Sequence, residues 1–386
     1  MSELKEYKLS DLMEIKYGKD HKHLADGSFP LYGSGGIMRY VEKSIYEEES
    51  ILIPRKGTLS NLFFVNEPFW SVDTMFWSKI KQDLVLPKYL YYTLKTYNLA
   101  ELNVGSAVPS LTTEVLNKVI ISIPDKNTQT SIAEILSSLD DKIELNNKIN
   151  QELENLAQTL FKRWFIDFEF PNENGEPYKS SGGEMVDSEL GEIPKGWEVD
   201  SIYKISDVIY GAPFKSNLFN QENRGFPLIR IRDLKTFKPQ NWTEEVHPKG
   251  TKIFAGDLVV GMDAEFRPHF WLGSPAWLNQ RVCHFRPKKN FSKLFVREII
   301  RPQLAFFENS SVGTTVIHLG KADIDTFKSI IPTNVVIIHF EEISNSIFET
   351  IINNSKEIQE LTNLRDTLLP KLISGELEVS QFLTNS

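Results

Sequence analysis

Two stretches of the chain repeat apolar residues at alternating spacings of four and three, the pattern of a coiled-coil seam. One stretch follows Pro124 and the other follows Pro332. The pattern predicts two long helices with matching seams, and the first helix should have Asn127 or Thr128 as its N-cap. The predicted seam positions are Ile132, Leu136, Leu139, Ile143, Asn146, Asn150, Leu153, Ala157, Leu160 and Trp164 in the first helix, and Phe340, Ser344, Ile347, Ile351, Asn354, Ile358, Leu361, Arg365, Leu368 and Leu372 in the second.

Short apolar runs separated by glycine-rich turns fill the chain before the first long helix. They predict strands at Ser50 to Ile53, Asn61 to Val65 and Ser71 to Ile80, and a helix near Lys88 to Tyr97. Residues 1–125 should therefore form a domain of mixed helices and strands, and the whole chain should be of the α+β class.

Over a long stretch, the second half of the chain repeats the first at a fixed offset of 208 residues, which also relates the two seams without a gap. A period near 200 residues indicates duplicated domains rather than a solenoid of small repeats. Before the seams, Val104-Gly105, Val108, Leu111 and Ile123-Pro124 recur as Val312-Gly313, Val316, Leu319 and Ile331-Pro332.

The N-terminal parts of the two copies match less closely. Leu9-Ser10-Asp11 corresponds to Ile205-Ser206-Asp207, Tyr17-Gly18 to Tyr210-Gly211, and Ile51-Leu52-Ile53 to Leu258-Val259-Val260. Between these anchors the polar residues differ, since Pro54-Arg55-Lys56-Gly57 stands where the second copy has Gly261-Met262-Asp263-Ala264. Either the exposed loops of the two copies recognise different targets, or they have drifted without a change of function.

The predicted organisation is a first globular domain at 1–125, a long helix at 126–170, a linker rich in Gly, Ser, Glu and Pro at 171–196, a second globular domain at 197–335, and a second long helix with the C-terminal segment at 336–380. If the two helices pack antiparallel, the globular domains lie at opposite ends, related by a pseudo-two-fold axis. Asn146 and Asn354 would then help to set the register of the helix pair. Exposed polar breaks in a frayed coil are the alternative for these two residues.

Composition places the chain in a reducing compartment. It has 386 residues and one cysteine, Cys283, in an apolar run that suggests a core position rather than a disulfide. We find no signal peptide and no apolar run of membrane-spanning length, so a soluble, cytoplasmic protein is expected.

The net charge of -9 is unevenly distributed. Residues 197–335 hold 19 Lys and Arg against 14 Asp and Glu, whereas residues 171–196 hold 2 against 6. Such a chain could contact DNA with one face, but it lacks the broad basic surface that binds phosphates tightly unaided. A DNA-binding role would therefore need help from a partner.

No catalytic signature stands out in the sequence. Tyr32-Gly33-Ser34-Gly35-Gly36 lacks the GxGxxG spacing of a nucleotide loop, and no GxxxxGK[ST] motif is present. The chain has no Pro-Pro pair, so the Asp/Asn-Pro-Pro-aromatic motif of amino-methyltransferases is absent. The seven histidines show no metal-binding spacing, and a metal site at His21 and His23, which lie in a polar loop, is the less favoured alternative. The sequence favours a binding protein.

Several motifs resemble type I restriction-modification specificity subunits. The segment Leu364 to Leu377 (LRDTLLPKLISGEL) resembles the end of the C-terminal helix of that family, and Glu189 to Trp197 resembles the start of its second copy. Leu31 to Ile37, together with Ile53 to Gly57, resembles one class of its target recognition domains.

The resemblance covers nearly the whole chain and implies a fold and an assembly. The fold would be two α/β target recognition domains separated by two long antiparallel coiled-coil helices. The partners would be double-stranded DNA, two methyltransferase subunits and restriction (translocase) subunits, with no membrane. This subunit would hold no cofactor; S-adenosylmethionine would bind the methyltransferase, and ATP and Mg the restriction subunit.

The site would consist of two half-sites with a nonspecific spacer set by the helices. About 38 helical residues span roughly 57 Å, which corresponds to about one to one and a half turns of duplex, since ~10.5 base pairs occupy about 35 Å.

The candidates for reading DNA are polar residues in turns beside strands. Arginine can pair with guanine, and glutamine or asparagine with adenine, in the major groove, while lysine mostly holds phosphate. For each candidate a surface salt bridge or a phosphate contact is the alternative. The candidates are Ser34, Arg39, Arg55, Lys56 and Asn61 in the first copy, and Lys215, Arg230, Arg232, Arg267, His269, Asn279, Gln280 and Arg281 in the second.

Three other interpretations stay open at this point. The chain could be the specificity subunit of a combined methyltransferase-nuclease system, or a coiled-coil scaffold that joins two protein-binding domains and never meets DNA. An adenine methyltransferase is a third, and it lacks the cofactor and catalytic motifs.

Overall fold

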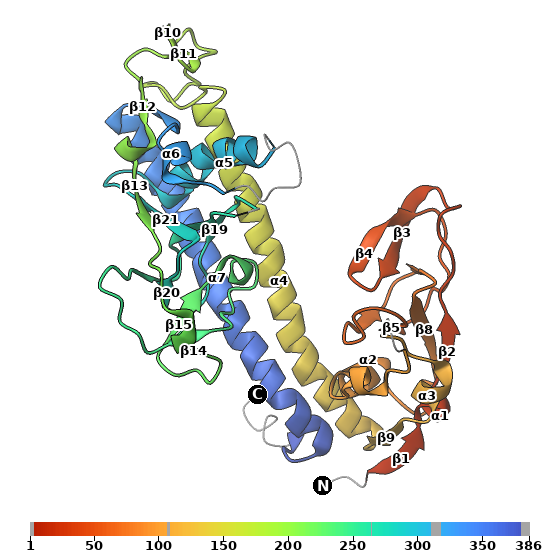
Figure 1. The fold of residues 1–386 in the computed structure, drawn as a ribbon. Coiled ribbons are helices and arrows are strands. Elements are labelled where there is room, and N and C mark those ends of the chain that lie inside the picture. Colours follow the sequence, from red (N-terminus) through yellow and green to blue (C-terminus); the bar gives the residue numbers. More distant parts are fainter. Residues whose placement is uncertain (1–3, 106–108, 264, 310–317, 380–386) are drawn as a thin grey trace. The chain divides into compact units, whose positions relative to one another are not determined.

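The structure, a computed structural model, describes residues 4–105, 109–263, 265–309 and 318–379 (Figure 1). Of the residues that carry the sequence repeat, Val108, Val312-Gly313 and Val316 lie outside this part. The described chain forms two compact units: unit 1 comprises residues 1–143 and 360–386, and unit 2 comprises residues 144–359.

Unit 1 is built on an antiparallel sheet in the order β2-β8-β5-β6, beside a three-stranded sheet β4-β3-β7 and the pair β1-β9. The strand predicted at Ser50 to Ile53 and the helix near Lys88 are confirmed, and the strand predicted at Asn61 to Val65 is present but begins at Phe63. The predicted strand Ser71 to Ile80 is divided, because a turn at residues 72–74 separates β7 from β8. The elements are β1 (Lys5–Lys8), α1 (Leu9–Leu12), β2 (Met13–Tyr17), β3 (Asp26–Gly33), β4 (Gly36–Val41), β5 (Ser50–Pro54), β6 (Phe63–Val65), β7 (Trp70–Ser71), β8 (Met75–Ile80), α2 (Pro87–Lys95), η1 (Leu99–Leu102), α3 (Thr113–Asn117) and β9 (Ile120–Ile123).

Unit 2 contains an antiparallel sheet in the order β13-β21-β18-β19, a five-stranded sheet β14-β16-β15-β20-β17 and the pair β12-β22. The linker is not a plain connection, because it forms a hairpin of β10 and β11. The elements are β10 (Met185–Ser188), β11 (Gly191–Pro194), β12 (Glu198–Ser201), η2 (Ile202–Lys204), β13 (Ser206–Tyr210), η3 (Ser216–Leu218), β14 (Phe219–Asn220), β15 (Phe226–Ile229), η4 (Ile231–Asp233), β16 (Trp242–Thr243), β17 (Lys252–Ile253), β18 (Leu258–Gly261), β19 (Pro268–Phe270), β20 (Ala276–Leu278), β21 (Val282–Pro287), α5 (Lys293–Asn309), α6 (Lys321–Ile324) and β22 (Lys328–Ile331).

The sheet topology confirms the internal repeat. Strands β2, β8, β5 and β6 of unit 1 correspond in order and direction to β13, β21, β18 and β19 of unit 2, and the parallel pair β3-β7 corresponds to β15-β20. Ile53 pairs with Phe76 as Val260 pairs with Cys283, which confirms that anchor.

One anchor of the sequence repeat was wrong by three residues. Lys8 pairs with Ile120 as Ser201 pairs with Lys328, so Leu9 corresponds to Ile202 rather than to Ile205. The two identical letters Ser-Asp suggested the wrong alignment, and backbone pairing decides the register.

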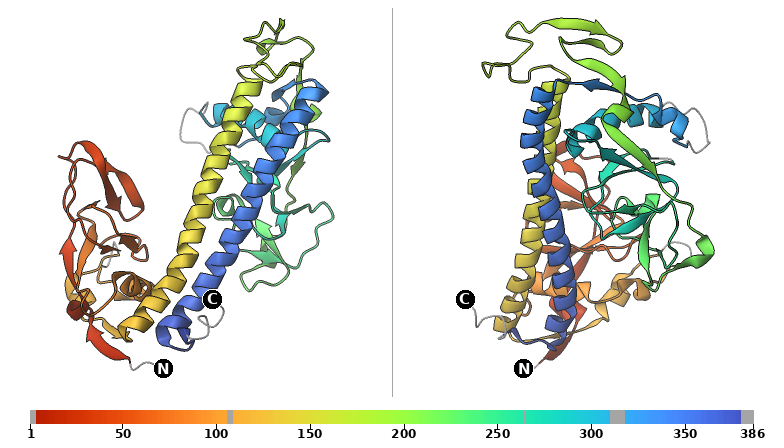
Figure 2. Two further views of the ribbon diagram at one scale, coloured as in Figure 1. Left: turned by 180° about the vertical axis from the view of Figure 1, so that it is seen from behind. Right: turned by 90° about the vertical axis from the view of Figure 1, so that its left-hand side faces the viewer.

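Two long helices, α4 (Lys126–Phe165) and α7 (Asn334–Ser374), confirm the predicted seams. In unit 1, Ile132 and Leu136 at the start of α4 are buried with Leu369 and Leu372 at the end of α7. In unit 2, Trp164 near the end of α4 contacts Phe340 near the start of α7, with ring centroids 5.7 Å apart. The start of α4 thus packs against the end of α7, and the end of α4 packs against the start of α7. The two helices are therefore antiparallel (Figure 2). All twenty predicted seam positions are buried or partly buried.

The N-cap of α4 is Asp125, not Asn127 or Thr128. The Asp125 carboxylate accepts hydrogen bonds from the backbone N–H groups of Asn127 and Thr128 at 2.9 and 3.1 Å. A carboxylate placed just before the first turn satisfies these free donors, which a residue already inside the helix cannot do.

Polar contacts cross the helix pair within unit 2. The Asn146 amide, 1 % exposed, donates to the Glu357 carboxylate at 2.8 Å, and the Asn354 amide donates to the Asn150 side-chain oxygen at 2.9 Å. Asn146 and Asn354 therefore each bond to the opposite helix but not to each other. Their role in setting the register stays a prediction.

Candidate nucleic-acid interface

A glycine brings the loop after β20 close to the end of β13 in unit 2. A Cβ atom on Gly211 would lie 2.0 Å from the carbonyl oxygen of Asn279, and the Gly211 N–H donates to Val282 O at 3.0 Å. Unit 1 has the same arrangement, with a Cβ on Gly18 2.0 Å from Val72 O and the Gly18 N–H bonded to Met75 O at 3.0 Å. The shared backbone frame fixes two equivalent turns, residues 72–74 and residues 279–281.

Side chains on the turn of unit 2 line a hollow of about 310 Å³. This hollow, which we call the arginine hollow, brings together five residues that the sequence predicted separately. Two come from the end of β15 and the start of η4, and three from the turn after β20. Its lining is Arg230, Ile231, Arg232, Asp263, Asn279, Gln280 and Arg281.

Arg281 has a left-handed backbone, with φ of 78°. Few side chains other than Gly, Asn and Asp adopt this conformation, and strain of this kind concentrates at functional sites. Its Nη1 lies 2.9 Å from His318 Nδ1 and 3.4 Å from Asp263 Oδ1. His318 Nδ1 is also 2.9 Å from Asp263 Oδ1, so the three side chains form one polar cluster.

Asn279 carries an unsatisfied acceptor in the same hollow. The residue is 7 % exposed, and its Oδ1 has no hydrogen-bond partner among the described residues. A buried amide oxygen without a donor is costly. Because this oxygen has almost no exposed surface, it is an unsatisfied acceptor in the wall of the hollow rather than an open contact point.

Asp233, the last residue of η4, holds the backbone at Arg230, the residue just before this helix. Its Oδ2 accepts the Arg230 N–H at 2.9 Å. Burial raises the pKa of the Asp233 carboxyl, and the hydrogen bond from Arg230 and the charges of Arg232 and Arg230 oppose this shift.

Three other predicted residues of unit 2 do not line the hollow. Arg267 is exposed, and His269 is partly buried two residues further on. Burial lowers the pKa of His269, and the positive charges of Arg267 and Lys235 add to the shift, so this ring favours its neutral form. Lys215 precedes η3, where its backbone N–H donates to Glu245 at 2.9 Å.

In unit 1 the predicted residues form a smaller group near the equivalent turn. The Arg55 guanidinium donates to Asp73 O at 3.2 Å and lies 5.2 Å from the centroid of the Tyr17 ring. Lys56 is exposed and forms a backbone bridge with Ser110.

The glycine-rich segment of unit 1 is a β-hairpin turn, in which Gly33 faces Gly36 between β3 and β4. Asn61 closes it by donating to Ser34 O at 3.0 Å. Arg39 lies on β4 and is occupied within the unit, because it donates to Asp26 at 2.8 Å and to two carbonyl oxygens at 3.0 Å.

The two turns present different chemical groups on the same frame. Arg55 N–H donates to Thr74 O as Met262 N–H donates to Arg281 O, and Leu111 N–H donates to Arg55 O as Leu319 N–H donates to Met262 O. These matching bonds show that Thr74 of unit 1 is the structural equivalent of Arg281 of unit 2. The other equivalent pairs are Val72 and Asn279, Asp73 and Gln280, Lys56 and Asp263, and Ser110 and His318.

Asp263 and His318 belong to this site but were not among the predicted residues. Asp263 falls in the segment where the two copies diverge, which was the available signal. His318 lies 37 residues from Arg281 in sequence, and only the backbone bridge between Asp263 and His318 brings it to the site.

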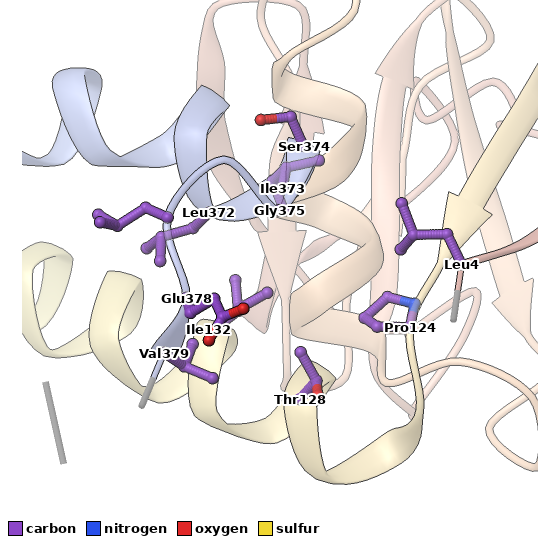
Figure 3. Close-up of a pocket in the computed structure, with 11 residues that line it drawn as sticks. Leu4, Pro124, Thr128, Ile132, Leu372, Ile373, Ser374, Gly375, Glu378 and Val379 are labelled. Carbon is purple, nitrogen blue, oxygen red and sulfur yellow. The ribbon is translucent and has the colours of Figure 1, made fainter. Parts of the chain in front are cut away.

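A second hollow, of about 210 Å³, is apolar and lies in unit 1 between the start of α4 and the end of α7 (Figure 3). Thr128 and Ile132 line it from α4, Leu372 and Ile373 from α7, and Leu4 from the chain before β1. In unit 2, Trp197 occupies the position before β12 and stacks on Phe170, with centroids 5.0 Å apart. At the equivalent position of unit 2, therefore, aromatic rings pack against one another, since Trp197 also lies 5.8 Å from the Phe165 ring.

The described residues contain no group of His, Cys, Asp and Glu that could hold a metal ion. His23 lies 3.8 Å from Asp20, and this pair alone is not a metal site. Within the same part of the chain, no helix combines the length and apolarity needed to cross a bilayer.

Comparison with known proteins agrees with the repeat. A family model described as "Type I restriction modification DNA specificity domain" matches residues 1–155 and 194–363, one match in each copy. The chain is 30 % identical to the type I restriction enzyme MjaIX specificity subunit of Methanocaldococcus jannaschii, over 93 % of this chain and 86 % of that protein. It is 28 % identical to the HindI specificity subunit of Haemophilus influenzae, over 76 % of this chain and 78 % of that protein. The S subunit of the type I restriction-modification system of M. genitalium shares the fold, with a TM-score of 0.60 at 16 % identity over 96 % of both chains.

Proposed function

Because this chain belongs to the family of type I restriction-modification DNA specificity subunits, we propose that it selects the duplex DNA sequence on which partner subunits act. Both copies of the repeat match the family, so each unit would read one half of a two-part, asymmetric site. The chain would supply recognition, while methylation and cleavage would take place on its partners.

The observation that carries this proposal is the arginine hollow of unit 2. Arg230, Arg232 and Arg281 supply positive charge, and Asn279 and Gln280 carry side-chain amides, the group that would pair with adenine. Because the turn of unit 1 has the same backbone and different side chains, the two units would read different bases.

The helix pair would set the spacer between the half-sites. It would also dock two methyltransferase subunits, and restriction subunits would join that assembly. S-adenosylmethionine would then be bound by the methyltransferase, and ATP with Mg by the restriction subunit. The complex would act in the cytoplasm.

The proposal is tested by substituting Arg281→Ala in the full chain, reconstituted with its methyltransferase partner. We expect altered base preference in one half of the site only, by about 1–3 kcal/mol of discrimination at one position. The measurement is sequencing of methylated sites from a randomised duplex library. A shift in both halves, or in neither, would contradict the assignment.

The same reconstitution separates the other interpretations. A scaffold that never meets DNA would give no salt-dependent shift of duplex DNA by the complex. A combined methyltransferase-nuclease system would be recognised from one copurifying polypeptide that carries both activities.

A further inference from the structure

We propose that Asp263 and His318 are positioning residues that hold Arg281 so that the free edge of its guanidinium reads a guanine in the half-site of unit 2. This inference rests on the proposed function and identifies the base and the residues that fix the reading group.

The first step concerns geometry. The polar cluster engages only Nη1 of Arg281, since both contacts, to His318 at 2.9 Å and to Asp263 at 3.4 Å, use that atom. Among the described residues, Nε and Nη2 have no partner. These two nitrogens form one side of the guanidinium fork, which matches the O6 and N7 acceptors of guanine.

The second step concerns order. A free arginine side chain on a turn loses conformational freedom when it binds, which reduces both affinity and selectivity. Here the strained backbone of Arg281, with φ of 78°, and the anchored Nη1 fix the side chain before DNA arrives. His318 Nδ1 lies between the other two groups, where it can donate to Asp263 or accept from Arg281.

The third step distinguishes a base edge from a phosphate. The Asp263 carboxylate lines the hollow and would repel a phosphate placed beside Arg281. A guanine edge presents two neutral acceptors, O6 and N7, to Nε and Nη2 of Arg281, and it brings no negative charge beside the Asp263 carboxylate.

The equivalent turn of unit 1 lacks this device. Thr74, Lys56 and Ser110 stand where unit 2 has Arg281, Asp263 and His318. The positioning cluster therefore belongs to one copy, and its loss should leave the other half-site unchanged.

The test uses the full chain with its methyltransferase partner and a randomised duplex library, read by sequencing of methylated sites. Arg281→Lys keeps the charge but removes the fork. We expect it to reduce the guanine preference at one position of the second half-site by about tenfold or more. Asp263→Asn and His318→Ala should reduce the same preference several-fold, whereas His318→Asn, which keeps a nitrogen or oxygen near the position of Nδ1, should retain it.

The matched control is Glu265→Gln. Glu265 also carries a carboxylate, but it pairs with Lys235 at 2.8 Å and does not line the hollow. This variant should keep the wild-type preference at every position. A merely structural role for Asp263 or His318 would instead lower methylation of all sites uniformly.

The possible failures are distinguishable. If Arg281→Lys keeps the preference and only the salt dependence of binding changes, Arg281 holds phosphate and the guanine assignment is overturned. If Arg281→Ala changes the second half-site while Asp263→Asn and His318→Ala do not, the positioning role is overturned and the proposed function stands. If none of the variants changes either half-site, the proposed function itself fails at this hollow.

Discussion

At the scale of single residues, burial and hydrogen bonding separate structural from recognition groups. Cys283 is fully buried, and burial raises the pKa of its thiol to about 12, which confirms the predicted core position. Trp70, Trp77 and Trp277 are also core residues, each with under a tenth of its surface exposed. The arginine hollow differs because its polar atoms are only partly satisfied within the chain.

Gly211 offers a test of the frame that carries the hollow. Since a Cβ there would meet the Asn279 backbone at 2.0 Å, Gly211→Ala must displace the turn 279–281. We expect a loss of about 1–3 kcal/mol in the free energy of unfolding, as for other overpacked sites, together with a weakened second half-site preference. Urea unfolding followed by tryptophan fluorescence measures the first effect, and library methylation measures the second.

The matched control for this substitution is Gly35→Ala. A Cβ on Gly35 would meet nothing within 4 Å, so its urea midpoint should equal that of the wild type. Equal midpoints for Gly211→Ala and Gly35→Ala would show that the close contact can relax without cost.

The sequence predicted most members of the site but not their grouping. Polar residues next to predicted strands can be recognised from the sequence alone, and this applies to Arg230, Arg232, Gln280 and Arg281. Their convergence depends on the parallel pairing of β15 with β20, a contact between segments about 50 residues apart. No local pattern encodes that pairing, and the same holds for His318.

At the scale of elements, the helices were the most predictable part of the fold. The alternation of four and three is a local signal, and all twenty positions that it predicted in α4 and α7 are buried or partly buried. The strand predicted at Ser71 to Ile80 is two strands, because the Met75 N–H donates to Val72 O at 3.0 Å and closes a turn at residues 72–74.

The length of the helix pair can be tested by inserting one heptad into each helix. One heptad inserted after Asn150 in α4, and one before Asn354 in α7, keeps the seam in phase because these two residues face each other. Each insertion adds about 10.5 Å, so the spacer should grow by about three base pairs. Library methylation should then report unchanged half-sites with a longer spacer.

A heptad inserted after Gly175 serves as the control, since this exposed glycine lies in the linker, away from the seam. It should leave the spacer unchanged. Altered half-site bases with an unaltered spacer in the double insertion would overturn the proposal that the helix pair sets the distance.

At the scale of the whole molecule, the uneven distribution of charge limits how the chain can bind DNA. The chain is acidic overall, and its basic excess is confined to residues 197–335, where 19 Lys and Arg face 14 Asp and Glu. Specific contacts can therefore be built in each unit without the broad cationic surface that would hold DNA nonspecifically.

This distribution predicts weak binding by the isolated chain. In an electrophoretic shift assay at about 150 mM salt, the chain alone should bind duplex DNA at least tenfold more weakly than its complex with the methyltransferase, because the partner would supply the missing phosphate contacts. Equal affinities, and equal slopes of affinity against salt concentration, would contradict this expectation.

The first unit is completed by the last helix of the chain, because Leu369 and Leu372 are buried in the same core as Ile132 and Leu136. During synthesis, residues 1–143 leave the ribosome first, yet their core must wait until residues 144–359 have been translated, which takes roughly 10 to 40 s at about 5–20 residues per second. Unit 1 therefore cannot complete its hydrophobic core at a time when unit 2 already has all of its residues and can fold. A nonsense codon within the final turns of α7 would therefore destabilise unit 1, most of which is translated first, rather than unit 2.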